Sequence, residues 1–396
     1  MYKTFFIAGL LLTIVLSVVL SPDIALQASL SGLTIWWKLV FPGLLPFLIL
    51  YEIILAFGLV HAIQATLSPF TTKLLKMPHS ASLPLIMSLL SGFPTGVEPT
   101  LKLLQDKQIN EQQAQRLLGY MHFPNPIFVT VIIGAGFFHT PIIGLIIIST
   151  IWISAFILMI VHSYFATRTS NVQTTSYNDN HARINFIASM ELGRKLDGRG
   201  LGKVLGDSVY ASVQKLFIIG GFIIFSSVIA AFATSLLNIF TLQMPFLSQA
   251  ILELHIGSYA ISAWTMSQSS IVLGCALLVA CLTFSGISGI LQVSFYTSGK
   301  ALHMAPFIKY RALHAIVGFF MTYILWKPLS WLFSKWLHIE YQSVFSTSAR
   351  GYVSASYQAQ QLPFIWKESL AICSIFIVIL AIITLWQKLH WKDQLF

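Results

Sequence analysis

Two short stretches place hydroxyl groups and glycines where the chain is otherwise apolar. The first reads Ser91-Gly-Phe-Pro-Thr-Gly96 and the second reads Ser285-Gly-Ile-Ser288. Each ends an apolar run, so a helix that stops there leaves backbone N–H groups without partners. Unpaired N–H groups at a helix start, with serine and threonine hydroxyls beside them, form a receptor for an anion. The chemistry that these residues predict is therefore the binding of a small carboxylate solute.

The composition places these stretches in a membrane protein. Of the 396 residues, 56% are hydrophobic and only 9% are charged, and the mean hydropathy is +0.78. A soluble domain carries about 25% charged residues, so this chain could not cover a soluble surface. We therefore expect an all-α, polytopic helical bundle. A backbone break at membrane depth survives only where protein or a water-filled cavity surrounds it, and paired breaks in two halves are typical of a transporter's binding site.

Charge and cysteine usage exclude several other functions. Lysine and arginine number 23 against 13 acids, a net charge of +10, but no dense basic run is present. The excess therefore fits the positive-inside bias of cytoplasmic loops and not nucleic-acid binding. The cysteines lie in apolar segments and predict packing, with no metal site and no cofactor. No HExxH motif and no nucleophile elbow with triad partners occurs, so we do not expect an enzyme.

Apolar runs and polar loops divide the chain into five parts. We expect an uncleaved first helix in 1–30, a first repeat in 31–166, a cytoplasmic polar loop in 167–207, a second repeat in 208–330, and an external loop with a last helix in 331–396. The full-length spans are predicted at 40–60, 141–161, 215–237, 312–326 and 372–386.

The first repeat also contains two half-length apolar runs, between residues 83 and 138. Each is broken and each faces a polar connector, which is typical of a helical hairpin that enters the bilayer and turns back. Asn110 and Gln113 predict a capping box at the start of the connector helix. Asn125 is expected to cap the half-helix that follows it, to donate to a ligand, or to do both.

Two acids lie inside apolar segments, one ahead of each break. Glu52 is expected to face a cavity or a partner, or to be protonated, because a carboxylate is costly in the membrane. Glu253 precedes the second break in a similar way. Either acid could carry a coupling proton, and either could instead orient backbone N–H groups. With the basic residues that follow each break, this arrangement is a weak internal repeat.

An ordered set of motifs resembles a known family, the sporulation integral membrane proteins called YlbJ or SpoVV. The motifs, spread over residues 30 to 330, include the runs 36–47, 91–96, 125–128, 252–257, 285–288 and 292–293. The resemblance implies the nucleoside-recognition (Gate) fold, similar to concentrative nucleoside transporters, with inverted repeats and two re-entrant hairpins. It also implies export of dipicolinic acid across the outer forespore membrane.

The breaks and the resemblance together define the candidate site residues. The substrate-binding candidates are Ser91, Gly92, Thr95, Gly96, Asn125, Ser285, Gly286, Ser288 and Gln292. The candidates for ion coupling or charge are Glu52, Glu98, Glu253 and His255. The sequence departs from the usual family pattern at Glu98, at the segment 121–124, at His255 and at Ile290. Because of these departures, the sequence does not determine the identity of the solute.

The function that we expect is transport of a small organic anion, with dipicolinate as the solute that the resemblance implies. The lipid bilayer of a bacterial cell is the second partner, and a homo-oligomer is left open. Two alternatives remain at this point. One is a non-transporting membrane gate or assembly protein that partners a channel, and the other is a transporter of a nucleoside-like solute.

Overall fold

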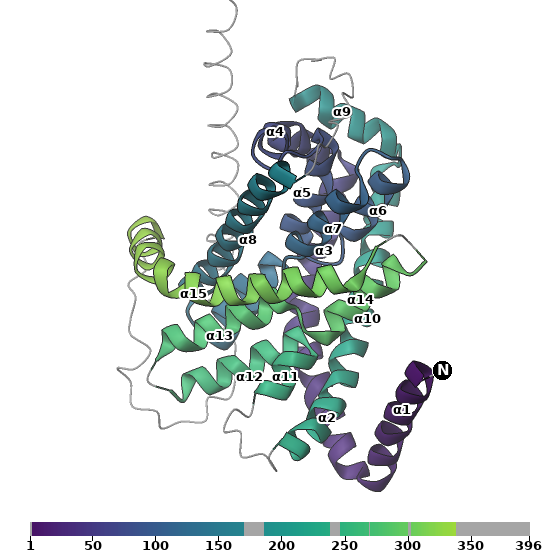
Figure 1. Cartoon of the computed structure of the whole chain (residues 1–396), viewed down its shortest axis with the longest axis vertical. Coiled ribbons are helices and arrows are strands. Elements are labelled where there is room, and N and C mark those ends of the chain that lie inside the picture. The colour runs from purple at the N-terminus through teal and green to yellow at the C-terminus, as the bar shows by residue number, and fades with distance from the viewer. Residues whose placement is uncertain (1, 170–185, 238–245, 269, 300–301, 338–396) are drawn as a thin grey trace, which may run out of the picture.

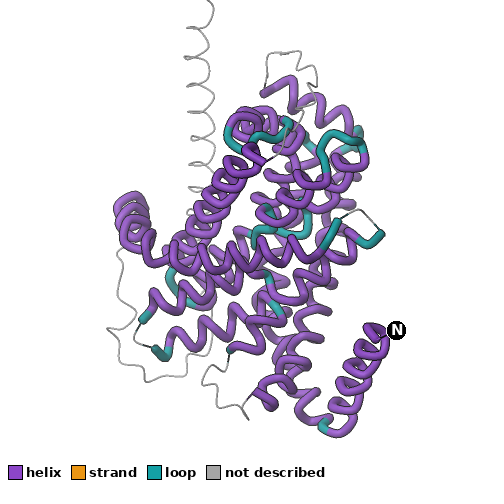
Figure 2. Tube along the Cα trace, in the orientation of Figure 1, coloured by secondary structure: helices purple, strands orange, loops and turns teal. Residues whose placement is uncertain are grey.

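The computed structural model describes residues 2–169, 186–237, 246–268, 270–299 and 302–337. Throughout these ranges the chain is helical, with short connecting loops and no strand (Figure 2). The all-α polytopic class is therefore confirmed. Of the segment 331–396, predicted as an external loop and a last helix, residues 331–337 belong to helix α15 (Met304–Leu337), and 338–396 lie outside the described residues.

The first half of the chain contains eight α-helices and three short helical segments of other types. They are α1 (Tyr2–Leu20), α2 (Pro22–Ile35), the π-helix η1 (Trp36–Val40), α3 (Phe41–Ala56), α4 (Leu59–Lys73), the 3₁₀-helix η2 (His79–Ala81), α5 (Ser82–Ser91), α6 (Val97–Gln105), α7 (Glu111–Tyr120), the π-helix η3 (Phe128–Phe137) and α8 (Pro141–Thr169). The capping box at the start of α7 is confirmed, because Asn110 Oδ1 accepts from Gln113 N and Gln113 Oε1 accepts from Asn110 N.

The second half repeats this alternation of long and short helices. It contains α9 (Phe186–Asp197), α10 (Leu201–Leu237), α11 (Leu247–Leu252), α12 (Leu254–Met266), α13 (Ile271–Phe284), α14 (Gly286–Thr297) and α15 (Met304–Leu337). In Figure 1, α10 and α2 run along the length of the molecule, whereas α15 crosses it.

Five stretches in the described part of the chain are long and apolar enough to cross a membrane. They are Pro22–Ala56, Pro141–Phe165, Leu201–Thr234, Ile271–Thr297 and Met304–Lys335. The predicted span 40–60 begins 18 residues too late, because α2, η1 and α3 follow one another without a gap. It also ends too late, because α3 stops at Ala56 before Gly58 adopts a φ of +76°. The polar loop ends earlier than predicted, since α10 already begins at Leu201.

The helices α2 and α3 pack along α10 in the opposite direction. Trp36 Nε1 donates to the Leu216 carbonyl at 2.9 Å, and the Trp36 ring covers Gly220. Further along α3, the Glu52 carboxylate forms an ion pair with Lys215 of α10. Residue numbers therefore rise along one helix while they fall along the other. Glu52 thus has a basic partner, one of the outcomes expected from the sequence.

The other two long helices, α8 and α15, also run antiparallel. Ser154 Oγ lies 3.0 Å from His314 Nε2, while Ile142, near the start of α8, packs with Leu329, near the end of α15. The short helices α5 to α7, η3 and α11 to α14 pack against these long helices and against one another. Most of their buried apolar side chains belong to one continuous core.

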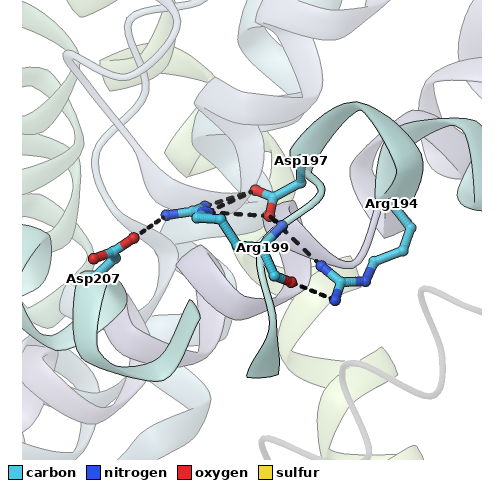
Figure 3. Close-up of polar contacts among 4 residues, drawn as sticks. All are labelled: Arg194, Asp197, Arg199 and Asp207. Atoms are coloured by element: carbon cyan, nitrogen blue, oxygen red, sulfur yellow. Dashed lines mark hydrogen bonds and ion pairs between the residues drawn. The ribbon is translucent and has the colours of Figure 1, made fainter. Parts of the chain in front are cut away.

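A cluster of charges joins α9 to the start of α10. The Arg199 guanidinium binds Asp197 Oδ2 at 2.6 Å and Asp207 Oδ2 at 2.8 Å, and Arg194 reaches the same Asp197 carboxylate at 3.5 Å (Figure 3). Hydrogen bonds from Arg199 lower the pKa of the Asp197 carboxyl below its usual value of 3.8. Together the charges fix the turn between the two helices.

Candidate functional site

Four interruptions of the short helices lie in the interior, and those of the first half contact each other. Helix α5 ends at Ser91, and Gly92 follows with φ +79°. A Cβ on Gly92 would lie only 2.6 Å from the backbone nitrogen of Asn125, which belongs to the interruption between α7 and η3. The Asn125 side chain stabilises this contact, because its Nδ2 donates to the Ser91 carbonyl at 2.9 Å.

Asn125 also caps the helix that follows it. Its Oδ1 accepts from Ile127 N at 2.8 Å and from Phe128 N at 3.1 Å. Of the two roles that the sequence allows for Asn125, capping is therefore the one that the structure shows. The side-chain amide bridges the two interruptions, so its donor and its acceptor are already engaged within the protein.

The interruptions of the second half contact each other in the same way. Helix α13 ends at Phe284, after which Ser285 and Gly286 both have positive φ, at +72° and +67°. A Cβ on Gly286 would lie 3.1 Å from the backbone nitrogen of Glu253, the residue between α11 and α12. Glu253 Oε2 accepts from His255 N at 2.6 Å and from Ile256 N at 2.8 Å, and so caps α12.

The two halves then meet across the middle of the molecule. A Cβ on Gly289 of α14 would lie 3.4 Å from His122 Nε2 and 3.7 Å from the Phe93 ring. The rings of Phe93 and His122 stack with centroids 4.2 Å apart. On the other side, the His255 ring contacts Phe128 at 4.5 Å between centroids. All four interruptions therefore belong to one buried region, which we call the central junction (92–96, 121–126, 253 and 285–289).

Arg311 of α15 is fully buried beside this junction. Its Nη2 donates to Ser285 Oγ at 3.1 Å, and its Nη1 donates to the Gly119 carbonyl at 3.2 Å and lies 3.4 Å from His314 Nδ1. No ion pair within the described part of the chain includes Arg311. An arginine therefore brings a positive charge to the point where the sequence predicts an anion receptor.

Three buried side-chain atoms at or beside the junction have no hydrogen-bond partner among the described residues. They are Ser91 Oγ, His122 Nε2 and Arg311 Nε. Ser91 is 5% exposed and His122 is 3% exposed, so water outside the protein does not satisfy them. An unpaired buried polar group costs about 1–3 kcal/mol, which makes these atoms suited to a bound polar solute.

A small pocket opens beside the junction. Its lining comes from α5, α6 and α7 with their connections, and consists of Ser88, Phe93, Pro94, Gly96, Val97, Thr100, Leu117, Leu118, Met121 and His122. Its volume is about 10 Å³, which is room for about one water molecule. A solute larger than water therefore fits only if the surrounding helices move apart.

The other predicted site residues lie in different surroundings, some inside the bundle and one at its surface. Thr95 Oγ1 donates to the Gly92 carbonyl of its own turn and to the Met87 carbonyl of helix α5. Gly96 has no room for a side chain, because a Cβ would lie 2.9 Å from the Pro84 carbonyl. Ser288 is buried in α14, and Gln292 is half-buried one turn further on. Glu98 differs from these, because it is exposed on α6.

Two of the four helix starts at the interruptions lack a side-chain cap, and at one of them, α6, the Val97 N–H donates to the Pro94 carbonyl. No side chain caps α6 or α14, the two helices that begin beside Gly92 and Gly286. The starts of η3 and α12 are instead occupied by Asn125 and Glu253. The Glu253 carboxylate also lies 2.7 Å from His255 Nδ1, so these two charge candidates pair with each other.

Sequence reasoning missed His122 and Arg311. His122 stands in the segment 121–124, where the sequence departs from the family pattern, and this was the signal for it. Arg311 is one of the basic residues that follow the second break, and the sequence analysis assigns it no separate role. Its neighbours Phe307 and His314 are also buried, a helical spacing that marks this face of α15 as internal.

These features define a class, the polytopic helical membrane proteins whose interrupted helices meet inside the bundle. Within this class, the chain is 31% identical over 364 residues to the sporulation integral membrane protein YlbJ of Bacillus subtilis (strain 168), and the match covers 87% of each chain. The protein therefore belongs to the YlbJ family of sporulation integral membrane proteins. No family profile matches the sequence, and no solved structure matches it.

Proposed function

We propose that the protein carries a small organic anion across a bacterial membrane. The observation that carries this proposal is the central junction, where four helix interruptions meet around buried polar atoms that lack partners. Interrupted helices that meet at mid-membrane are the usual construction of a transporter's solute site. Membership of a sporulation family and the resemblance to dipicolinate exporters make dipicolinic acid the proposed solute and the outer forespore membrane the proposed location.

The order of the helices supports an inverted repeat. Each half contains a long helical stretch, two interrupted short elements and a second long helix: α2–α3, α5/α6, α7/η3 and α8, then α10, α11/α12, α13/α14 and α15. The equivalent long helices of the two halves run antiparallel. Gly32 lies against Ser227 while Trp36 lies against Leu216, and Ile142 packs with Leu329 while Ser154 lies against His314. Halves related by a two-fold axis in the membrane plane have this arrangement. In this order the Gly92 interruption corresponds to Glu253, and not to Gly286.

The charges favour an anionic over a cationic solute. Arg311 is buried without an acidic partner in the described part of the chain, and α6 and α14 begin without side-chain caps. The Glu253 carboxylate, the one acid in the junction, is already held by two backbone N–H groups and by His255. The charge of Glu253 is therefore engaged within the protein while that of Arg311 has no acidic partner, which suits a carboxylate.

Transport is tested with purified protein in liposomes. We expect time-dependent uptake of radiolabelled dipicolinate that excess unlabelled dipicolinate abolishes and excess uridine does not. Uptake of uridine instead would favour the nucleoside-like alternative, and absence of flux with any solute would favour the non-transporting gate. In cells, deletion of the gene should leave dipicolinate synthesis intact while spores contain little of it. A normal dipicolinate content in spores of the deletion strain would exclude dipicolinate as the transported solute.

A further inference from the structure

The Arg311 side chain carries more donor capacity and more charge than its contacts use. Its two Nη atoms donate to Gly119 and Ser285, which fixes α15 against α7 and against the α13–α14 interruption. This structural role accounts for Nη1 and Nη2. It leaves Nε without a partner and the positive charge without a counter-ion in the described chain. A buried ion without a partner is strongly destabilising. The two hydrogen bonds that fix α15 therefore do not by themselves explain why a charged residue is buried here.

The contacts of Arg311 also hold Ser285 in a strained conformation. A φ of +72° costs a residue other than glycine about 1–2 kcal/mol, and such strain persists where the surroundings impose it. Ser285 Oγ accepts the hydrogen bond from Arg311 Nη2 at this same position. The guanidinium is therefore coupled directly to the turn that begins α14, one of the two helices without a side-chain cap.

His122 connects Arg311 to the pocket. It lines the pocket, its ring lies against Phe307 one turn before Arg311, with centroids 5.3 Å apart, and its unpartnered Nε2 faces Gly289. A Cβ on Gly289 would lie 3.0 Å from Ser285 Cβ as well as 3.4 Å from His122 Nε2, so the imidazole lies beside the serine that Arg311 binds. The pocket lining, an unsatisfied imidazole nitrogen and the turn that Arg311 binds are therefore neighbours in the central junction.

We propose that Arg311 is the counter-charge for one carboxylate of the transported solute, with His122 Nε2 as a second donor beside it. The carboxylate accepts hydrogen bonds from Arg311 Nε and His122 Nε2 and supplies the missing negative charge. This inference rests on the proposed transport function and adds to it the residue that selects for an anion. The guanidinium suits this role because its fork of N–H donors matches the geometry of a carboxylate.

The test compares three ligands of one shape and different charge. Pyridine-2,6-dicarboxylate carries two carboxylates, 6-carbamoylpyridine-2-carboxylate carries one, and pyridine-2,6-dicarboxamide carries none. Binding to the full-length protein in detergent is measured by isothermal titration calorimetry and by thermal stabilisation. For the wild type we expect both anions to bind and the diamide to bind at least tenfold more weakly. Equal affinity for all three ligands would overturn the proposal.

The variant Arg311→Gln removes the charge, and Lys309→Gln is its matched control because it removes an exposed charge from the same helix. We expect Arg311→Gln to bind the dicarboxylate at least tenfold more weakly while its affinity for the diamide stays the same or rises. A merely structural role would weaken both ligands alike. We expect Lys309→Gln to bind the three ligands with the same ranking of affinities as the wild type.

If Arg311→Gln does not fold, the variant Arg311→Lys decides the question. It keeps the charge and loses the planar fork, so we expect at least fivefold weaker binding of the dicarboxylate and an unchanged diamide. Wild-type affinity for the dicarboxylate in a folded Arg311 variant would overturn the proposal. Failure of the wild type to bind any carboxylate would instead refute the proposed function itself, which keeps the two outcomes distinct.

Discussion

At the scale of single residues, the central junction depends on positions where a side chain would separate the interruptions. Gly92 has φ +79° and its α-carbon faces the backbone of Asn125, whereas Gly286 has φ +67° and faces the backbone of Glu253. Both features require glycine, since a left-handed φ is costly for other residues and a backbone neighbour has little freedom to move away. The two glycines are therefore the points that bring the interruptions of each half into contact.

The first prediction concerns Gly92→Ala. The left-handed φ costs about 1–2 kcal/mol for alanine, and a Cβ 2.6 Å from the Asn125 nitrogen must push the two interruptions apart. We expect a lower Tm in detergent and loss of dipicolinate binding. Gly221→Ala is the control, because this glycine lies within α10 with nothing within 4 Å of an added Cβ. Equal effects of the two substitutions would contradict the contact described here.

At the scale of elements, the sequence predicts where the short helices are interrupted, but it does not predict which segments contact each interruption. The ends of α5 and α13 and the capping box of α7 depend on neighbouring residues, so local patterns are enough to place them. The contacts of Gly92 with Asn125 and of Gly289 with His122 join segments that are distant in the chain, and no local pattern encodes them. The early start of α10 was missed because glycines and charges at 200–207 are typical of a loop, although packing overrides that propensity.

The second prediction concerns the ion pair that joins α3 to α10. The Lys215 side chain is 39% exposed and that of Glu52 is 18% exposed, so solvent screening limits the coupling to about 0.2–1 kcal/mol. We expect a double-mutant cycle with Glu52→Gln and Lys215→Gln to return a coupling free energy in this range, measured from Tm shifts. Because the pair is structural, Glu52→Gln should keep the pH dependence of transport. A flattened pH profile would assign proton coupling to Glu52 instead.

The third prediction concerns the charge cluster at the α9–α10 turn. The pKa of Asp197 is lowered in the folded protein, so its contribution is complete above the usual value of 3.8 and is lost as the pH falls through the lower folded value. Between pH 5 and pH 8 the α9–α10 turn should therefore remain equally well ordered. We expect Arg199→Gln to increase hydrogen exchange in residues 197–203 at pH 7, with the exposed Lys203→Gln as control. Unchanged exchange in Arg199→Gln would show that the cluster does not hold the turn.

At the scale of the whole molecule, the proposed inverted repeat requires equivalent parts of the two halves to face opposite sides of the membrane. The α6–α7 turn of the first half corresponds to the α12–α13 turn of the second half in the order of elements. Helix α7 follows the first turn and lies near the start of α15, where Gln115 Nε2 donates to the His303 carbonyl. Helix α13 runs antiparallel to α15, since Ser285 lies near Arg311 while Val279 lies near Gly318. The second turn is therefore near the opposite end of α15.

The last prediction tests this arrangement by labelling single cysteines in the membrane. Asp106→Cys lies in the α6–α7 turn, Ser267→Cys lies in the α12–α13 turn, and Lys203→Cys marks the side of the α9–α10 turn; all three positions are exposed. The background is Cys373→Ser, with Cys275 and Cys281 left in place because both are buried. We expect a membrane-impermeant maleimide to label Asp106→Cys and Lys203→Cys from one side of the membrane and Ser267→Cys from the other, as halves of opposite orientation require. Labelling of Asp106→Cys and Ser267→Cys from the same side would show that the two halves are not inverted, and alternating access around the central junction would then need a different pair of moving parts.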